Sequence, residues 1–357
     1  MKRSNLIALA GAASVAVLGL SACSSGSSGS GGGDGLTIAF LMPESNTTRY
    51  ETFDRPLFEA KVKELAPGST ILYSNANGDP TQQQSQLESV LAQGPDVVVL
   101  NAADSVQGES LVTTAASADV PVIAYDRFID NDDVSYYVSF DNPVVGQLQA
   151  QSLVDHLKND LGKTSGDLLM VNGAPTDPNA AQYKQGAHSV IDKSGFSVVG
   201  EFDTPNWAAD DAQQWVEGQL GTIDRASLLG VYAGNDSTAS GVIAALSGAG
   251  ITPVPPVTGQ DAELTAVQRV VAGTQYMSVY KSIKQQAEDA AAAAVALAGD
   301  SEPTSATTTD GIPATLLTPV AMTAQNIADT VIADGVYTSE DICTPELQAA
   351  CTELGLS

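Results

Sequence analysis

The stretch Val120-Pro-Val-Ile-Ala-Tyr-Asp126-Arg127-Phe-Ile129 runs from a buried-strand pattern straight into an adjacent acid and base. In open α/β sheets, ligands bind outside the carboxyl ends of the strands, so charged side chains at such an end are candidates for recognition. Asp126 offers acceptors and Arg127 a planar fork of donors, which together suit ligands rich in hydroxyl groups. A surface salt bridge is the alternative, because exposed ion pairs are common and contribute little.

Strand and helix patterns alternate in both directions from this stretch, which predicts parallel sheets with crossover helices. The first series places strands at 36–42, 69–76, 95–102, 120–126 and 134–141, with helices at 55–65, 80–93, 107–118 and 143–158. The second series places strands at 166–173, 196–203, 228–235 and 257–261, with helices at 179–192, 208–220 and 238–248. A strand at 275–281, an alanine-rich helix at 283–298 and a late strand at 314–320 follow. We predict an α/β fold of two Rossmann-like lobes.

The N-terminus resembles a bacterial lipoprotein signal: a positive Met1-Lys-Arg, an apolar run over 6–20, and then Leu20-Ser-Ala-Cys23. We expect residues 1–22 to be removed and Cys23 to carry a lipid anchor on the extracytoplasmic face of the cell membrane. An ordinary secretory signal or a short membrane helix is the alternative, although a span needs roughly 20 apolar residues. Residues 23–35 are almost wholly Ser and Gly and are expected to form a flexible tether.

The chain is strongly acidic, with 42 Asp and Glu residues against 15 Lys and Arg residues and a net charge of −27. Nucleic acid is therefore excluded as an expected partner, since phosphate contacts dominate its binding. The acidic residues are dispersed along the sequence, which indicates a solvated surface rather than a disordered tail.

Cys343 and Cys351 are the remaining cysteines, and outside the cytoplasm two cysteines usually pair, so we expect a disulfide. Two free buried thiols are the alternative. Neither His156 nor His188 lies near a cysteine, and the acidic stretch 130–133 lacks the later Gly and Glu of a calcium loop. No metal and no cofactor are predicted.

Polar residues gather where the predicted strands end: Asp126-Arg127, Asn172 with Asn179, Asn235-Asp236, Gln260-Asp261 and Lys281. Taken singly, each fits a helix cap or a turn, and Asp236 is predicted to cap the helix that follows it. Two lobes whose strand ends face one another would bring the others into one cleft.

Several segments resemble, in order and spacing, the xylose-type and related monosaccharide-binding proteins of ABC importers. They are Arg49-Tyr-Glu-Thr-Phe-Asp-Arg55, Tyr125-Asp-Arg-Phe-Ile129, Tyr137-Val-Ser-Phe-Asp-Asn142 with Gly146-Gln147, Asn235-Asp236, Gly259-Gln-Asp-Ala262 and Val279-Tyr-Lys281. The resemblance implies the type I periplasmic-binding-protein fold, in which three crossovers join two lobes that close on a sugar. We expect one lobe to comprise 36–138 and 262–308, and the other 139–261 and 309–357.

The family's sugar contacts map onto matching positions of this sequence: Arg49, Tyr50, Asp126, Arg127, Asn179, Trp207, Asn235, Asp261 and Lys281. Tyr50 stands where the family has Trp, and Pro178 stands where it has Asn, so the choice among xylose, glucose and similar sugars stays open. The aromatic rings suit the apolar face of a pyranose. The charges of these residues nearly cancel, since Arg49, Arg127 and Lys281 face Asp126 and Asp261, and this balance suits a neutral ligand.

The resemblance implies a monomeric solute-binding protein that delivers its sugar to the permease and ATPase subunits of an ABC importer. A binding protein for a cyclic signalling polyol, or a sugar chemosensor, is the alternative.

Asp126 and Asp261 could form a glycosidase pair, but their cationic or amide neighbours should keep both ionised, whereas a general acid needs a raised pKa. Because no nucleophile elbow, zinc helix or phosphate loop is present, we do not predict an enzyme. A transcription regulator of this fold would need a basic helix-turn-helix, whereas this N-terminus resembles a lipoprotein signal, so we do not predict a regulator.

Overall fold

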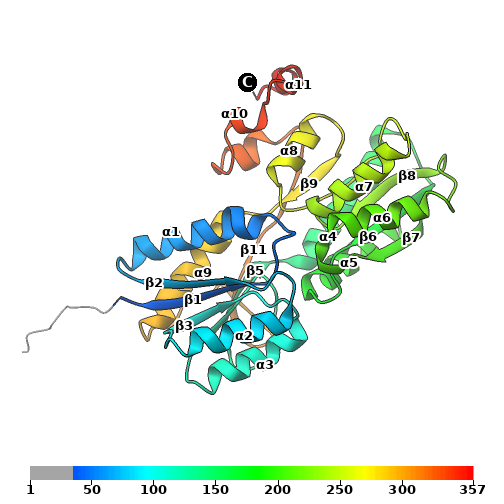
Figure 1. Ribbon diagram of the computed structural model, residues 1–357. Helices are drawn as coiled ribbons and strands as arrows, with labels where there is room; N and C mark the ends of the chain where they lie inside the picture. The colour runs from blue at the N-terminus through cyan, green and yellow to red at the C-terminus, as the bar shows by residue number, and fades with distance from the viewer. Residues whose placement is uncertain (1–34, 357) are drawn as a thin grey trace, which may run out of the picture. The chain divides into compact units, whose positions relative to one another are not determined.

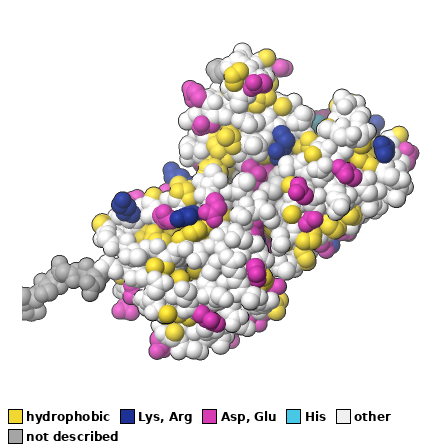
Figure 2. All heavy atoms as spheres, viewed as in Figure 1, with side chains coloured by type: hydrophobic (Ala, Val, Ile, Leu, Met, Phe, Trp, Pro, Cys, Tyr) yellow, Lys and Arg dark blue, Asp and Glu magenta, His cyan; other side chains and the backbone are white. Residues whose placement is uncertain are grey.

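The computed structural model describes residues 35–356, so the predicted signal segment and Cys23 lie outside the described residues. None of the helices in this range has the length and apolarity that crossing a membrane requires. On the face shown in Figure 2, acidic side chains are scattered rather than gathered into one block.

The first sheet has seven strands in the order β10-β11-β5-β4-β3-β1-β2, and all but β10 pair in parallel. Helices α1 and α9 cover one face, and α2 and α3 cover the other (Figure 1). The strands are β1 (Thr37–Met42), β2 (Thr70–Asn75), β3 (Val97–Leu100), β4 (Val122–Tyr125), β5 (Val134–Phe140), β10 (Thr307–Thr309) and β11 (Ile312–Leu317). The helices are α1 (Arg55–Leu65), α2 (Pro80–Leu91), α3 (Ser105–Ala116) and α9 (Ile283–Ala298). Burial on both faces explains the continuous apolar runs of the central strands.

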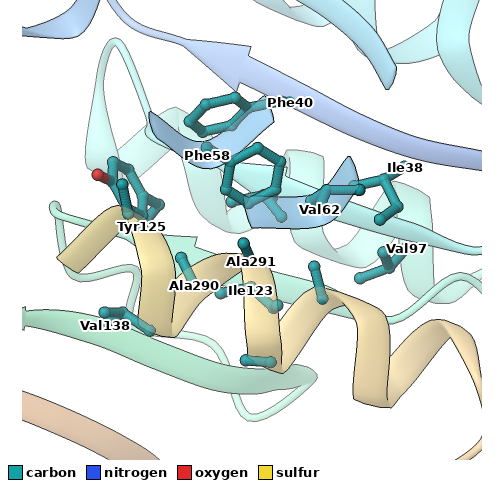
Figure 3. Packing of buried hydrophobic residues seen from close by; sticks show 14 of the residues in the cluster. Ile38, Phe40, Phe58, Val62, Val97, Ile123, Tyr125, Val138, Ala290 and Ala291 are labelled. Carbon is teal, nitrogen blue, oxygen red and sulfur yellow. The ribbon is translucent and has the colours of Figure 1, made fainter. Parts of the chain in front are cut away.

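The core between this sheet and helices α1 and α9 fixes the end of β4 (Figure 3). The rings of Phe40 and Phe58 lie 4.2 Å apart, and Tyr125 packs edge-on against Phe40 at 5.6 Å. The small side chains of Ala290 and Ala291 face this cluster and are fully buried, so α9 can lie close to the sheet. Asp126 therefore directly follows a strand end that the core packing holds in place.

The second sheet has the strand order β7-β6-β8, all parallel, with α4 and α5 on one face and α6 and α7 on the other (Figure 1). Its strands are β6 (Asp167–Asn172), β7 (Ser197–Asp203) and β8 (Leu228–Ala233), and its helices are α4 (Asn142–Asp155), α5 (Pro178–Ile191), α6 (Ala209–Gln219) and α7 (Asp236–Gly248). A Cβ on Gly146 would lie 1.9 Å from the Tyr183 carbonyl oxygen, so the close contact of α4 with α5 requires glycine there.

The predicted strand at 257–261 is wrong, because only single bridges join Val257 to Val231 and Gln260 to Val279. Positive φ values at Asp261 (88°) and Ala262 (49°) turn the chain away from an extended course. Helix α8 (Leu264–Val271), which no pattern predicted, fills the turn, and β9 (Met277–Tyr280) follows.

The chain crosses between the two lobes three times: between β5 and α4, between β9 and α9, and between β11 and β12 (Val320–Thr323), where β9 and β12 form a separate two-stranded sheet. The first and third crossovers touch, since the Asp141 amide donates to the Leu317 carbonyl at 3.1 Å. The α/β fold of two Rossmann-like lobes joined by a three-crossover hinge is thus confirmed.

Sheet membership differs from the predicted lobe boundaries in two places. Residues 264–280 accompany the second lobe, because the Tyr276 amide donates to Val257, which bridges to β8, and Ser278 donates to Asp236 of α7, so the crossover falls at 281–283 rather than at 261–262. Strand β11 joins the first sheet through β5, which moves 309–317 out of the second lobe. The physical reason is a tight hairpin at Asp310-Gly311, where both residues have positive φ (47° and 88°) and β10 folds back on β11.

The C-terminal segment packs beside α8 in its own apolar cluster and contains η4 (Ala328–Ile332), α10 (Ser339–Ile342) and α11 (Gln348–Glu353). Cys343 and Cys351 form the expected disulfide within it. Phe53, which precedes α1, reaches this cluster by an edge-on contact with Tyr337 at 5.6 Å. The segment therefore borders the hinge.

Candidate functional site

A small cavity lies where the strand ends of the two lobes face one another. Eight of the nine predicted ligand residues line it: Arg49, Tyr50, Asp126, Asn179, Trp207, Asn235, Asp261 and Lys281. Arg127 is the ninth, and it lies behind the wall, where its Nη1 donates to the Ala102 carbonyl at 3.0 Å and its Nε lies 3.0 Å from Asp177 Oδ2. Thr47, Asp177, Tyr183 and Gln260 complete the lining.

Arg49 is placed by the turn η1 (Tyr50–Asp54), a single wide helical turn closed by a bond from the Arg55 amide to the Tyr50 carbonyl. Such five-residue turns often occur at functional sites. The turn sets Arg49 beside Asp54, whose carboxylate accepts from Nε at 2.9 Å and from Nη2 at 2.6 Å. Both side chains are almost completely buried. The guanidinium is thereby fixed at the wall of the cavity.

Asp126 leaves β4 with a positive φ of 63°, which turns its side chain toward the cavity. The Tyr50 hydroxyl donates to Oδ2 at 2.9 Å, and the Asp126 carbonyl accepts from Ser139 Oγ at 2.6 Å. Burial disfavours the charged carboxylate, but the cations Arg49, Lys281 and Arg127 outweigh it, so the pKa of Asp126 falls to about 2. Asp126 is ionised at neutral pH, as the sequence predicted.

The second lobe contributes residues at the start of α5. Asp177 caps this helix by accepting from the Asn179 amide at 2.9 Å, and it also accepts from Trp207 Nε1 at 3.1 Å. Arg127 reaches the same carboxylate from the first lobe. Burial raises the pKa of Asp177, and Arg127 opposes that rise. One carboxylate therefore caps a helix, orients an aromatic ring and links the two lobes.

Asn235 caps α7: its side chain accepts from the Thr238 amide at 2.9 Å, and Thr238 Oγ1 accepts from the Asn235 amide at 3.1 Å. The predicted capping role of Asp236 is wrong, because Asp236 is the first residue inside the helix. Its buried carboxylate accepts instead from Ser278 Oγ at 2.8 Å, Gln275 Nε2 at 2.7 Å and the Glu263 amide at 3.0 Å.

The hinge supplies an ion pair. Lys281 Nζ lies 2.8 Å from Asp261 Oδ1, and the same oxygen lies 3.7 Å from Arg49 Nη1. Lys281 follows β9 at the second crossover, whereas Asp261 occupies the left-handed turn after Gln260. A group bound beside Asp261 would therefore contact the hinge itself.

Arg49 Nη1 and Gln260 Oε1 on the cavity lining are buried without a hydrogen-bond partner, and Asp261 Oδ1 is contacted only by the cations Lys281, at 2.8 Å, and Arg49, at 3.7 Å. A buried polar atom that stays unpaired costs about 1–3 kcal/mol, and more where it is charged. These atoms include donors and acceptors on one cavity, beside the rings of Tyr50 and Trp207. Such a surface can bind a molecule that carries hydroxyl groups and an apolar face.

The lobes touch across the cleft. Asn46 Nδ2 donates to the Asn206 carbonyl at 3.0 Å, Ser237 Oγ donates to the Asn46 carbonyl at 3.1 Å, and Asn179 Nδ2 donates to the Asp126 carbonyl at 3.0 Å. These bonds join segments of opposite lobes around the cavity. The arrangement is that of a closed cleft.

Sequence reasoning missed four lining residues for different reasons. Gln260 stood among the strand-end residues, and Asp177 lies two positions before Asn179, so both had a local signal. Tyr183 lies one helical turn after Asn179 on α5, a spacing that places both on one face. Thr47 gave no signal, because its position depends on the loop before η1.

Residues 38–302 match the family described as a periplasmic binding protein domain. The D-xylose-binding periplasmic protein of Escherichia coli K12 is 36% identical to this chain over 297 residues, which are 81% of this chain and 87% of that protein. The protein of the same description from Haemophilus influenzae is 38% identical over 298 residues, with the same two shares.

An ABC transporter solute-binding protein from Clostridium phytofermentans with bound β-D-glucose has a similar solved structure. Its TM-score is 0.77 and its sequence identity 28%, and the match covers 86% of this chain and 99% of that chain. The similarity thus extends over both lobes.

Proposed function

Because the chain belongs to the periplasmic binding protein family, we propose that it captures a monosaccharide such as xylose or glucose between its lobes and delivers it to an ABC importer. The resemblance found in the sequence to the xylose-type binding proteins is confirmed. The named relatives bind D-xylose, and the solved structure holds β-D-glucose. These two sugars are therefore the first ligands to test.

The observation that carries this proposal is a set of buried polar atoms on one cavity: Arg49 Nη1 and Gln260 Oε1 have no hydrogen-bond partner, and Asp261 Oδ1, paired with Lys281, can still accept from a hydroxyl. Each hydroxyl of a sugar donates one hydrogen bond and accepts others, so a sugar can satisfy all three atoms. The rings of Tyr50 and Trp207 line the same cavity and are almost completely buried, which suits the apolar face of a pyranose.

Charge balance supports a neutral ligand. The cavity and its wall hold Arg49, Arg127 and Lys281, and Asp177 adds a third carboxylate to Asp126 and Asp261. Each of these cations already faces a carboxylate, so an anionic sugar would add an unbalanced negative charge to the buried cleft. We therefore propose selection for uncharged sugars over uronic acids and sugar phosphates.

We propose that the protein acts as a monomer, anchored through Cys23 on the extracytoplasmic face, and that the closed lobes form the surface that the permease recognises. The relatives are transport proteins rather than enzymes. Asp126, with its low pKa, is a hydrogen-bond acceptor and not a general acid.

Replacing Cys23 with Ser should release the protein from membranes or leave it unprocessed while sugar binding persists, and unchanged membrane retention would contradict the anchor.

Isothermal titration calorimetry tests the binding proposal. Residues 35–357 should be titrated with D-xylose, D-glucose, D-galactose, L-arabinose, D-ribose, myo-inositol and D-glucuronate. We expect saturable one-to-one binding of at least one neutral monosaccharide and none of D-glucuronate. Tighter binding of myo-inositol than of every sugar would make a cyclic polyol the ligand, and no heat with any compound would refute the function.

A further inference from the structure

Two buried side chains outside the cavity lining, Asp54 and Gln286, hold the guanidinium of Arg49 from behind. Asp54 accepts from Nε at 2.9 Å and from Nη2 at 2.6 Å, and Gln286 Oε1 accepts from Nη2 at 2.5 Å. A guanidinium has five N–H donors, and these three bonds use the one on Nε and both on Nη2. The two hydrogens on Nη1 are left over.

Arg49 Nη1 is buried and makes no hydrogen bond. It lies 3.7 Å from Asp126 Oδ1 and 3.7 Å from Asp261 Oδ1, too far for hydrogen bonds to either. The unpaired nitrogen thus stands between two carboxylates, one on the first lobe and one at the hinge. A hydroxyl placed there could accept from Nη1 and donate to a carboxylate.

Gln286 connects this arginine to Asp126. While its Oε1 faces Arg49, its Nε2 donates to Asp126 Oδ1 at 3.3 Å and to the Val138 carbonyl at 3.3 Å. The opposite orientation of the amide would set an NH₂ group against the guanidinium, so both ends of Gln286 are fixed. Gln286 comes from the first turn of α9, and α9 packs against the core of the first sheet.

We propose that Asp54 and Gln286 are positioning residues, which aim Arg49 Nη1 and the Asp126 carboxylate at one and the same ring hydroxyl of the bound sugar. The inference rests on the proposed function and assigns the recognition of that hydroxyl to the first lobe. Fixing the donor and acceptor before binding removes the side-chain ordering that binding would otherwise require. Asp54 is itself held, because the Tyr125 hydroxyl donates to its Oδ1.

The test uses Asp54→Asn and Gln286→Met, with Glu51→Gln and Gln285→Met as matched controls. Glu51 lies in the same turn as Asp54 and Gln285 precedes Gln286 on α9, but both controls are exposed and neither lines the cavity. Affinity for the tighter of D-xylose and D-glucose should fall roughly tenfold or more in each positioning variant, since hydrogen bonds to charged groups are at stake. The controls should stay within about twofold of the wild type.

Monodeoxy analogues, each lacking one ring hydroxyl, separate positioning from a general loosening of the fold. The wild type should discriminate most strongly against one analogue, and Asp54→Asn and Gln286→Met should reduce that discrimination while leaving the ratios for the other analogues unchanged. Equal losses for every analogue, or unchanged affinity in both variants, would overturn the assignment.

The two variants also guard against failure to fold. If circular dichroism shows that Asp54→Asn is unfolded, Gln286→Met decides alone, because it leaves the Arg49–Asp54 ion pair intact. Failure of the wild type to bind any sugar would refute the proposed function instead. Wild-type binding with undiminished discrimination in a folded variant refutes only the positioning roles.

Discussion

The two halves of the cavity are built by different means. In the first lobe, Arg49, Asp54 and Asp126 are held mainly by one another, through a bidentate ion pair and the amide of Gln286. In the second lobe, Asn235 and Asn179 are placed by helix starts: Asn235 caps α7, and Asn179 follows the cap of α5. The first half depends on charge compensation and the second on helix capping.

This difference teaches that the same loss of affinity should have different side effects in the two halves. A change in the charged half leaves a buried charge uncompensated, which costs several kcal/mol of stability. A change at a helix cap costs about 1 kcal/mol and can be repaired by any residue that caps equally well. The following variants test that contrast, beginning with the largest effect.

Arg49→Met should have the largest effect, because it leaves the carboxylates of Asp54, Asp126 and Asp261 without their shared cation. We expect the free energy of unfolding to fall by about 3–5 kcal/mol, together with loss of measurable sugar binding. Urea denaturation followed by circular dichroism measures the first, and calorimetry the second. A stability loss below about 1 kcal/mol would show that the first half does not depend on charge compensation.

Asp126 should destabilise the first half in acid, in contrast to Asp177 of the second half, whose pKa is raised by burial. The pKa of Asp126 in the folded protein, about 2, lies below the ordinary value of 3.8, so its stabilising contribution is complete above pH 4 and is lost as the pH falls toward 2. The contribution amounts to about 2 kcal/mol. The difference in unfolding free energy between the wild type and Asp126→Asn should shrink by that amount between pH 5 and pH 2. A constant difference would contradict the low pKa.

Asn235 allows the smallest and cleanest comparison. Asn235→Ala removes the cap of α7 and should lower the free energy of unfolding by about 1 kcal/mol, whereas Asn235→Ser keeps a capping oxygen and should lower it less. Both variants lose the amide that faces the cavity, so both should bind sugar more weakly. Equal stability of the Ala and Ser variants would mean that capping does not hold this half in place.

The fold was largely predictable because strand and helix periods alternate so regularly. The strand at 197–203 and the helix at 55–65 lie within a residue of their predicted bounds. The exceptions occur where left-handed residues decide the course of the chain: Asp261 ends a strand pattern, and Asp310-Gly311 forms a hairpin. Asp261 and Ala262 adopt positive φ without the signal that a glycine gives, whereas the Asp310-Gly311 pair is a hairpin signal that the predicted elements did not include.

The cavity lining was predictable where a polar residue follows a strand, as with Asp126 after β4 and Asn235 after β8. The residues behind it were not. Arg49 meets Asp54 five positions later through a wide turn, a spacing at which α-helical periodicity brings no side chains together. Gln286 lies in an alanine-rich helix next to a second glutamine, Gln285, which is exposed, and nothing in the sequence tells the two apart. Only the tertiary arrangement distinguishes the two glutamines.

Small-angle X-ray scattering of residues 35–357 with and without saturating sugar tests most directly the claim that the two halves close on one ligand. A ligand that contacts both halves stabilises the closed cleft by its greater affinity for that state. The radius of gyration should therefore decrease on addition of sugar and approach the value calculated from the closed structure. Identical radii with and without sugar, under conditions where calorimetry shows saturation, would contradict the account.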